Sequence, residues 1–352
     1  MYAPKYTISN SILRSIGQVE AARDVVENAP LVPDYEKEFK SDAFVRTVYH
    51  GTQIEGNELT LQQAKQVIEG ESVIAKERDI QEVINYRNVM RIIDELSDVE
   101  EYTLDQLLTI HKQTVENIID PVKAGVLRTT QVVIREAGTG NVIFRPPNAV
   151  EVPFLIQEFL SWLNSPDARE IHPIIRAGIT HYVLVTIHPF VDGNGRSVRS
   201  FATLVMLKEK YDIKRFFAIE EHFDRDLAAY YDAFFKVDNQ GGEIGSRDLT
   251  PWLEYFCHVV AIELTKIKEK VRKISIDSRM KLKIGEQVAL SARQMKLIEY
   301  LSEHGKAGMA ELKDVLPMVS EDTVLRDLKD LMSKNIVEKE GSTKASTYSL
   351  RH

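Results

Sequence analysis

The chain has 352 residues, of which 43% are hydrophobic and 28% are charged, the balance of a soluble globular protein. At roughly 150 residues per domain, this length predicts two or three domains. Lys and Arg total 45 against 53 Asp and Glu, and the net charge of −8 excludes a globally basic nucleic-acid-binding protein. The single cysteine, the lack of a signal-peptide pattern and the short apolar runs exclude secreted and membrane classes, so we expect a cytoplasmic protein.

Helical periodicity dominates the first hundred residues and predicts an N-terminal helical region over 1–102. The expected helices lie over 41–50, after the N-cap Thr60, over 80–96 and over 103–118. Residues 51–58 are expected to interrupt the first of them. Thr103 and Gln106 have the spacing of a capping box, which marks the start of the last helix.

The first strand signal follows at residues 131–134, which are rich in β-branched side chains, and it returns at 142–144. Gly140 lies between these runs, and Pro146 and Pro147 end any pairing. The pattern predicts a β-hairpin. Because a lone two-stranded hairpin is only marginally stable, we expect this one to pack on helices.

The middle of the chain is again helical. Residues 152–164 form an amphipathic pattern, whereas 173–187 are apolar on nearly every face and predict a helix buried in the domain centre. Further helices are expected over 196–208, 224–236 and 250–271. The segment 266–283 holds eight Lys or Arg and two acidic residues, so 260–287 is expected to be a solvated helical linker, with a basic face as the alternative.

Residues 288–352 are predicted to form a separate winged helix-turn-helix. Helices are expected over 291–302, 309–316 and 320–333, followed by a hairpin of 336–339 and 346–350 around Gly341-Ser342. This tail carries ten basic and ten acidic residues. Because phosphate contacts supply most nonspecific DNA affinity, a net charge of zero does not favour DNA binding, and protein recognition or dimerisation is the alternative.

One segment carries chemistry: residues 188–199 read His-Pro-Phe-Val-Asp-Gly-Asn-Gly-Arg-Ser-Val-Arg. It places His188 at the end of the buried helix and then a loop with two glycines before a new helix that starts near Asn194. Backbone N–H groups at such a turn and helix N-terminus favour an anion. Arg196 and Arg199 leave the new helix from one face, so the segment predicts a polyphosphate cradle.

Two further side chains complete this cradle. Asp192 is the only carboxylate inside the segment and is placed to hold a divalent cation that bridges phosphates. His188 is the natural general base for a hydroxyl nucleophile.

The segment resembles the signature of the Fic family, His-x-Phe-x-(Asp/Glu)-Gly-Asn-Gly-Arg-x-x-Arg, at every position. Weaker resemblance extends from about Thr103 to Val259, which implies a Fic (Fido) catalytic domain over 103–259. It includes a Leu-x-x-Ile-His stretch ending at His111, Gly125 to Arg128, Pro146-Pro147, Tyr230-Tyr231 and Pro251-Trp252. The implied fold is mainly α: a Fic-type helical core with a β-hairpin flap, an N-terminal helical segment and a C-terminal winged helix-turn-helix.

The resemblance implies a protein adenylyltransferase, which transfers AMP from ATP to a Ser, Thr or Tyr hydroxyl of a target protein, or of the enzyme itself, and releases pyrophosphate. In that reaction His188 would deprotonate the hydroxyl, Asp192 would hold Mg²⁺, and Phe190 would anchor the loop. The implied phosphate contacts are Gly193, Asn194 and Gly195 on the α- and β-phosphates, Arg196 on the β-phosphate and Arg199 on the γ-phosphate.

Other implied contacts lie outside the signature. Tyr231 would contact the adenine or ribose, and Asp238 or Asn239 would touch the adenine. The hairpin from Val132 to Phe144 would pair with the target segment as an added strand. The resemblance also implies a homodimer.

Thr52-Gln53-Ile54-Glu55-Gly56-Asn57 resembles the inhibitory motif (Ser/Thr)-x-x-x-Glu-(Gly/Asn) of Fic proteins with an autoinhibitory helix. In those proteins the glutamate pairs with the second signature arginine and blocks the γ-phosphate, which would make Glu55 the inhibitory residue here. The Ser/Thr position falls on Gly51, and Thr52 lies one residue late, so the helix that carries Glu55 is expected to be held less well.

Two other functions stay open at this point. The same pocket supports the reverse reaction, removal of AMP by a water that Glu55 activates. A DNA-binding regulator would use the winged helix as its active part and the Fic core as a sensor. Phosphocholine or phosphate transfer is disfavoured because both signature arginines are present.

Overall fold

The computed structural model describes residues 2–29, 33–135, 140–211, 215–284, 290–341 and 346–351. These residues form two compact units: the first comprises 1–27 and 36–267, and the second 28–35 and 268–352. Helices make up most of both units, so the predicted mainly α fold is confirmed. Within the described ranges, no helix is both long and apolar enough to cross a membrane.

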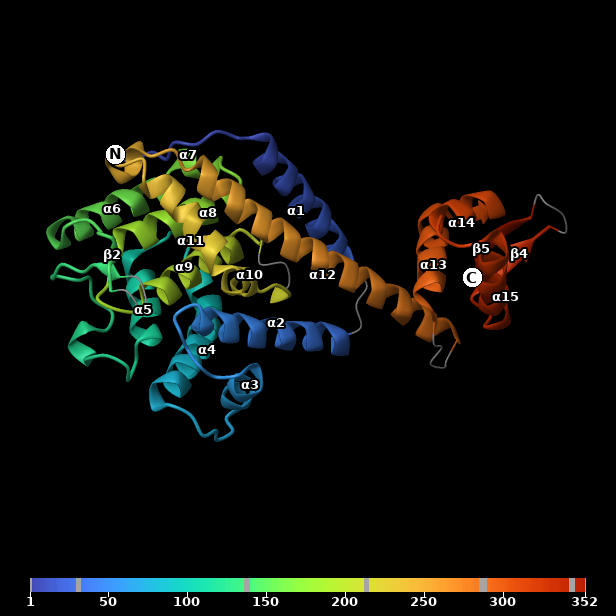
Figure 1. Ribbon diagram of the computed structural model, residues 1–352, viewed down its shortest axis with the longest axis horizontal. Coiled ribbons are helices and arrows are strands. Elements are labelled where there is room, and N and C mark those ends of the chain that lie inside the picture. Colours follow the sequence, from blue (N-terminus) through green and yellow to red (C-terminus); the bar gives the residue numbers. More distant parts are fainter. Residues whose placement is uncertain are drawn as a thin grey trace. The chain divides into compact units, whose positions relative to one another are not determined.

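The first unit is built around two central helices, α8 and α9, which pack on each other in the middle of the unit (Figure 1). Helix α6 packs on α8, while α4 and α5 pack on α9. The helices of this unit are α1 (Asn10–Asn28), α2 (Pro33–Gln53), α3 (Leu61–Glu69), α4 (Glu77–Ser97), α5 (Leu104–Thr114), α6 (Val152–Leu163), α7 (Pro166–Arg169), α8 (Pro173–Ile187), α9 (Asn194–Lys208), α10 (Ile219–Arg225), α11 (Leu227–Asp238) and α12 (Thr250–Ile284, continuing into the second unit).

Most of the predicted helices are present, and two of their starts follow the predicted caps. The hydroxyls of Thr60 and Thr103 each accept the N–H three residues later, and Gln63 and Gln106 return the bond, so both capping boxes are complete. Helix α8 begins at the predicted residue because His172 caps it and Pro173 occupies its first position. It also ends as predicted and buries nearly every side chain.

Several predicted boundaries were wrong. The helix expected over 41–50 begins at Pro33, and the helix expected over 103–118 ends at Thr114. Gly51 to Gln53 continue α2 instead of interrupting it. The helix expected over 224–236 is two helices, because Asp226 leaves the helical conformation and its side chain caps α11 by accepting the Ala229 N–H. Helix α12 continues to Ile284, through the segment that was expected to be a helical linker, and α1 and α7 were not predicted.

Helix α2 is held in the first unit by a buried charge cluster. Arg46 contacts the carboxylates of Glu221 and Glu263, the latter at 3.0 Å from Nη1. Burial raises the pKa of Glu263, but hydrogen bonds from His222 and Arg46 outweigh burial and lower this pKa to about 2. Since breaking one partner of such a cluster leaves an uncompensated buried charge, the position of α2 on α10 and α12 is strongly determined.

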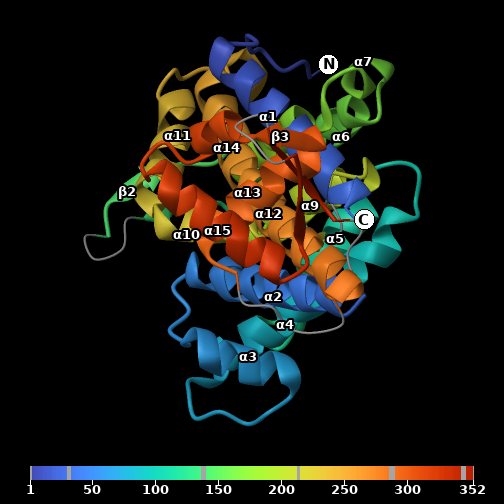
Figure 2. The ribbon, with the colours of Figure 1, turned by 90° about the vertical axis from the view of Figure 1, so that its right-hand side faces the viewer.

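Beyond the last part of α12, the described residues of the second unit form three helices and a three-stranded antiparallel sheet (Figure 2). Its elements are α13 (Ala292–His304), β3 (Lys306–Gly308), α14 (Met309–Val315), α15 (Glu321–Ser333), β4 (Val337–Glu340) and β5 (Thr347–Leu350). The sheet order is β3-β5-β4, so the sheet includes a strand, β3, that the sequence did not predict. The middle of the predicted hairpin turn, residues 342–345, lies outside the described residues.

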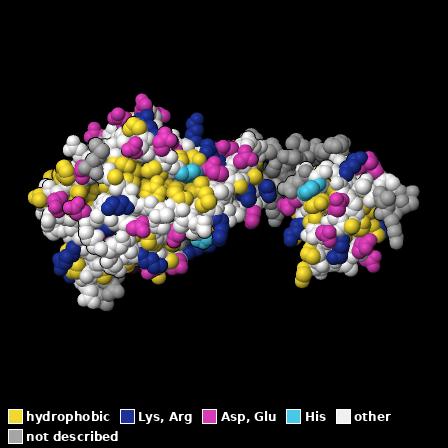
Figure 3. Space-filling view, turned by 90° about the horizontal axis from the view of Figure 1, so that it is seen from above, with side chains coloured by type: hydrophobic (Ala, Val, Ile, Leu, Met, Phe, Trp, Pro, Cys, Tyr) yellow, Lys and Arg dark blue, Asp and Glu magenta, His cyan; other side chains and the backbone are white. Residues whose placement is uncertain are grey.

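On the face of the second unit seen in Figure 3, the described residues show acidic and basic side chains intermixed. Several of its charges neutralise one another. Arg293 lies 2.8 Å from Asp327, Lys334 lies 2.6 Å from Asp330, and Lys306 lies 2.6 Å from Glu340. The described part of the second unit therefore pairs several of its acidic and basic side chains locally.

Candidate active site

The loop between α8 and α9 brings the signature residues together. His188 ends α8 in the left-handed conformation with φ 52°, and Gly193 starts α9 with φ 73°. A Cβ atom at Gly193 would lie 2.5 Å from Val115 Cγ1, so both the conformation and the space at this position require glycine. The loop therefore makes a close turn against α5, directly before the N-terminus of α9.

Asn194 closes this loop with its side chain. Its Oδ1 accepts the Phe190 N–H at 2.9 Å and its Nδ2 donates to the Phe190 carbonyl at 2.9 Å. Oδ1 and one N–H of Nδ2 are thus used to close the loop. The backbone of Asn194 lies in the first turn of α9.

Phe190 anchors the loop in the core, as the resemblance implied. Its ring is fully buried and stacks on the His111 imidazole with centroids 3.7 Å apart and an interplanar angle of 3°. His111 Nδ1 lies 3.0 Å from the Gly125 amide, which can only donate, and Nε2 lies 3.1 Å from the Asp192 carbonyl, which can only accept. These partners select the neutral tautomer with the proton on Nε2.

Arg128 also braces the loop, a role that the resemblance over Gly125 to Arg128 did not predict. Its buried guanidinium donates to backbone carbonyls around the loop: His188 at 2.8 Å, Pro147 at 2.7 Å and Thr130 at 3.2 Å. The backbone N–H of Arg128 donates to the Pro189 carbonyl at 2.9 Å. Arg128 therefore joins the base of the flap to the end of α8.

The His188 imidazole is half-buried at the end of α8. Burial is the main cause that lowers its pKa to about 4, so the ring is neutral at pH 7. Nδ1 lies 3.3 Å from the Val185 carbonyl. A proton on Nδ1 leaves the lone pair of Nε2 free to accept a proton from another molecule, which is the form that a general base needs.

Arg196 and Arg199 are almost fully buried, at 1% exposure each, on the first two turns of α9. Arg196 Nη1 lies 3.3 Å from Glu82 Oε1 on α4. Among the described residues, Nε of Arg196 and Nε of Arg199 have no hydrogen-bond partner, and Nη1 of Arg196 has only its ion-pair contact with Glu82. Buried donors without partners are costly, so these groups suit an anionic ligand.

Glu55 pairs with Arg199. Arg199 Nη2 donates to Glu55 Oε1 at 2.9 Å and to the Gly51 carbonyl at 2.8 Å. Burial lowers the pKa of Arg199, but the neighbouring Glu55 carboxylate outweighs it, and the net shift is upward. The second bond goes to a backbone carbonyl, so it does not depend on the side chain at position 51.

The Glu55 carboxylate also covers the first turn of α9. A Cβ atom built on Gly195 would lie only 2.1 Å from Glu55 Oε1 and 3.0 Å from Arg199 Nη1. The carboxylate thus occupies the region beside the helix N-terminus where an anion is favoured. Glycine at 195 is needed for this approach.

Gly51 packs against a buried tyrosine of α4. A Cβ atom at position 51 would lie 2.3 Å from Cε1 of Tyr86, whose side chain has no exposed surface. The Tyr86 ring therefore fills the space that the Ser or Thr side chain of the inhibitory motif would take at position 51. The expectation that this helix is less well held does not take account of Tyr86, which no local sequence pattern connects to Gly51.

Asp192 lies at the mouth of the site with its side chain 38% exposed. Oδ1 accepts the Gly193 N–H at 2.6 Å, and Oδ2 lies 3.2 Å from Nη2 of Arg78 on α4. Within the described ranges, no cluster of three or more potential metal-ligating side chains occurs. A single carboxylate fits Mg²⁺, which usually takes one or two carboxylates and completes its shell with water and substrate phosphates.

Tyr231 lies on α11 and is 43% exposed. The pKa of its hydroxyl is raised, first by burial and then by the Glu55 carboxylate. Asp238 is engaged elsewhere, since Oδ1 accepts from the Tyr182 hydroxyl at 2.6 Å and from Arg247 Nη1 at 2.7 Å. Asn239 is the C-cap of α11.

The predicted hairpin is present as β1 (Ile134–Arg135) and β2 (Val142–Phe144). Ile134 pairs with Phe144 and Arg135 with Val142, in antiparallel register. Residues 136–139 of the expected turn lie outside the described residues. The base of the hairpin is fixed by Gln131 Nε2, which donates to the Pro146 carbonyl at 3.1 Å.

We expect the protein to lose stability as the pH falls from 6.5 to 4. Burial lowers the pKa values of His111 and His188 to about 4, so over this range the unfolded chain binds protons that the folded chain does not. Each histidine contributes a slope of up to about 1.4 kcal/mol per pH unit. Urea unfolding at pH 6.5, 5.5 and 4.5 measures how the free energy of unfolding changes with pH. A His111→Gln variant should show a shallower slope, and an equal slope would contradict this origin.

Comparisons with known proteins identify relatives of this site. The Fic/DOC family model matches residues 101–206, which include the whole loop and α8. Protein adenylyltransferase Fic of Drosophila grimshawi is 30% identical over 219 residues, which cover 61% of this chain and 41% of that protein. Protein adenylyltransferase fic-1 of Caenorhabditis briggsae is 32% identical over 266 residues, covering 74% and 48%. The chain thus spans less than half the length of these curated relatives.

A solved structure extends the similarity of fold. A Fic family protein from Desulfovibrio desulfuricans G20 matches 99% of this chain and 98% of its own with a TM-score of 0.63. The two sequences are 24% identical, so this likeness shows the fold alone.

Proposed function

Since residues 101–206 form a domain of the Fic/DOC family, we propose that this chain is a protein adenylyltransferase. It transfers AMP from ATP to a Ser, Thr or Tyr hydroxyl of a protein. The observation that carries the proposal is the pair of buried arginines, with unpartnered donors, beside a neutral His188 and a helix N-terminus.

In this proposal His188 is the general base. Nε2 takes the proton of the target hydroxyl as its oxygen forms a bond to the α-phosphorus, and the bond from the α-phosphorus to the bridging oxygen breaks to release pyrophosphate. The neutral ring supports this role because a protonated imidazole could not accept the proton. Arg128, which bonds the His188 carbonyl, keeps the ring at the mouth of the loop.

The phosphates lie on the first turns of α9. The backbone N–H groups of Asn194 and Gly195 and the guanidinium of Arg196 bind the α- and β-phosphates, and Arg199 binds the γ-phosphate. Gly193 provides the turn beside the phosphates, while its N–H stays on Asp192. Tyr231 contacts the adenine or ribose with its exposed ring. Asp192 would hold Mg²⁺, whose charge would neutralise the phosphate oxygens.

Glu55 is the inhibitory residue in this proposal. Its carboxylate pairs with the arginine that the γ-phosphate needs, and it lies over Gly195, so it keeps the triphosphate out by occupation and by repulsion.

The test is transfer of label from [α-³²P]ATP to protein, with intact mass measured for a +AMP adduct. We expect label on the Glu55→Gly variant, either on itself or on proteins of a lysate. If neither wild type nor this variant labels any protein, the adenylyltransferase assignment is wrong.

We also propose that the second unit is a winged helix-turn-helix. The order α13-β3-α14-α15-β4-β5 and the sheet order β3-β5-β4 support it. Its balanced charges favour protein recognition over DNA. The division into 1–102, 103–259, 260–287 and 288–352, the homodimer and the cytoplasmic location remain predictions of the sequence.

We expect Gly51→Ala to raise basal transfer. The new Cβ would clash with the buried Tyr86 ring, so either the ring or the end of α2 must shift, and the Gly51 carbonyl moves from Arg199. Overpacking of this kind costs about 1–3 kcal/mol, part of which loosens the contact between Glu55 and Arg199.

The measurement for this prediction is the rate of self-labelling beside the melting temperature. Gly17→Ala is a matched control, because a Cβ there meets no atom within 4 Å. A drop in melting temperature with unchanged labelling would show that Gly51 supports only the fold.

A further inference from the structure

A second charged pair reaches the signature loop from α4, separately from Glu55. Arg78, in the first turn of α4, places Nη2 3.2 Å from Asp192 Oδ2. Its Nε donates at 3.2 Å to Oε1 of Glu82, which lies one turn later on the same face of the helix. Arg78 and Glu82 are called the α4 bridge below.

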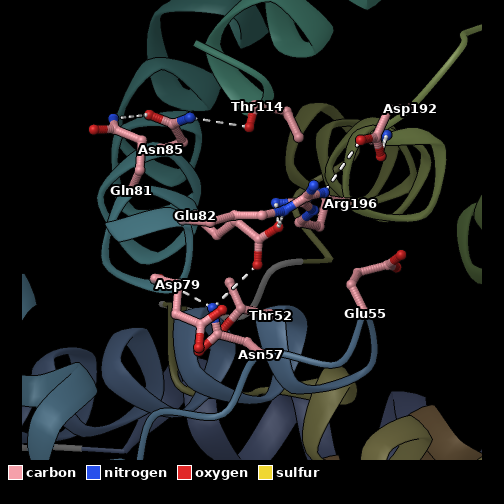
Figure 4. Close-up of polar contacts among 12 residues, drawn as sticks. Thr52, Glu55, Asn57, Asp79, Gln81, Glu82, Asn85, Thr114, Asp192 and Arg196 are labelled. Carbon is pink, nitrogen blue, oxygen red and sulfur yellow. Dashed lines mark hydrogen bonds and ion pairs between the residues drawn. The ribbon is translucent and has the colours of Figure 1, made fainter. Parts of the chain in front are cut away.

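Glu82 fixes the bridge in place. Its side chain is almost fully buried, and Oε2 accepts from Asn57 Nδ2 at 3.1 Å. Asn57 also donates to the Asp79 carbonyl at 3.0 Å. Figure 4 shows Glu82 between Asn57 on one side and Arg196 on the other. The turn that carries Glu55 thus supports Glu82, and Glu82 orients Arg78.

The bridge occupies the oxygen that a cation would take. Oδ1 of Asp192 already accepts the Gly193 N–H at 2.6 Å, so Oδ2 is the oxygen that faces out of the loop. Mg²⁺ binds carboxylate oxygens at about 2.0–2.1 Å. A guanidinium on the same oxygen stands where the metal and its waters would be, and its positive charge repels them.

We propose that Arg78 is a positioning residue that holds Asp192 Oδ2 and competes with the divalent cation for it. The inference rests on the proposed function, and it adds a contact that acts on the metal-binding carboxylate while Glu55 acts on the γ-phosphate position. Cation binding therefore requires Arg78 to release Asp192, whether or not Glu55 has moved.

The expected effect is modest because water screens the pair. The side chains of Arg78 and Asp192 are 59% and 38% exposed. Exposed ion pairs shift an equilibrium by up to about fivefold. Removing the Arg78 guanidinium should tighten cation binding by about two- to fivefold.

The experiment measures Mn²⁺ binding by electron paramagnetic resonance in the presence of saturating ADP, with full-length protein that carries Glu55→Gly. Arg78→Gln is compared with Arg91→Gln, which removes an exposed arginine from the same helix roughly 20 Å further along it. We expect tighter Mn²⁺ binding for Arg78→Gln and no change for Arg91→Gln. Arg78→Lys, which keeps the charge but cannot reach both carboxylates in the same fork, should lie between.

A cycle with Asp192→Asn separates competition from a general effect on α4. If Arg78 acts through the Asp192 carboxylate, Arg78→Gln has no effect once Asp192 is Asn. Unchanged or weaker Mn²⁺ binding for Arg78→Gln alone would overturn the proposal, the weaker case indicating that Arg78 contacts the nucleotide.

Labelling from [α-³²P]ATP with the same preparations distinguishes the two levels of inference. Transfer with no difference in Mn²⁺ binding leaves the adenylyltransferase assignment intact and removes the role of Arg78. No Mn²⁺ binding with ADP and no transfer in any variant overturns both.

Discussion

Replacing His188 by alanine is expected to lower the rate of AMP transfer by about 10²- to 10⁴-fold, the usual range for losing a general base. The variant should still bind ADP and ATP, because the phosphate contacts come from the first turns of α9 and not from the ring. Single-turnover transfer from [α-³²P]ATP in the Glu55→Gly background measures the rate, and calorimetric titration with ADP measures the binding.

The left-handed backbone at His188 calls for a second variant. Its φ of 52° is strained for alanine, whereas asparagine tolerates this region. His188→Asn should therefore lose the same activity with a smaller change in melting temperature. His258→Ala, at an exposed position of α12, is the control and should transfer normally. Substantial transfer by both His188 variants would assign the base elsewhere.

The pH profile adds an independent check on the same residue. Because burial lowers the pKa of His188 to about 4, the base is already deprotonated at neutral pH. The kcat/KM of the Glu55→Gly enzyme should be flat with respect to His188 from pH 6 to 8 and should fall only as the pH approaches 4. A fall centred near 6.5 would mean that the ring is solvated during turnover.

The signature loop was readable from the sequence because its chemistry is contiguous. His188, Asp192, Arg196 and Arg199 fall within one loop and two helical turns, so spacing alone predicts that they converge. Helix α8 was equally clear from the sequence. His172 and Pro173 mark its start, and its run of apolar residues matches its burial on all sides.

The supports of that loop were not readable, because their partners lie far away in the chain. Arg128 bonds the carbonyls of Pro147 and His188, which lie 19 and 60 positions later, and carbonyl acceptors leave no mark in the sequence. The space beside Gly51 is set by Tyr86 of another helix. The bonds of the Asn194 amide to Phe190 likewise depend on the fold of the loop.

The same limit applies to helix ends. Asp226 reads as an ordinary polar residue of a helical run, but its side chain competes for a backbone N–H and starts a new helix. Residues after 271 are highly charged and were expected to form a helical linker, and α12 does continue through them, because Lys and Arg are good helix formers.

Replacing Glu55 by glycine is expected to raise self- and target-labelling by about ten- to a hundredfold. A charge-assisted hydrogen bond contributes roughly 1.5–3 kcal/mol, and its loss frees the Arg199 guanidinium for the γ-phosphate. The change also removes the carboxylate that lies over Gly195. The initial rate of labelling from [α-³²P]ATP measures the effect.

The matched control is Glu58→Gly, which removes an exposed carboxylate from the same segment. The Glu58 carboxylate pairs with Lys76 at 2.7 Å and not with a signature residue. It should leave labelling unchanged. Glu55→Asp should raise labelling less than Glu55→Gly, because a shorter carboxylate still lies near Arg199, while the Gly51 carbonyl keeps its own bond to that guanidinium. If Glu55→Gly leaves transfer unchanged or lowers it, Glu55 does not inhibit. Loss of AMP removal from a modified protein in the same variant would instead make Glu55 the group that activates water in the reverse reaction.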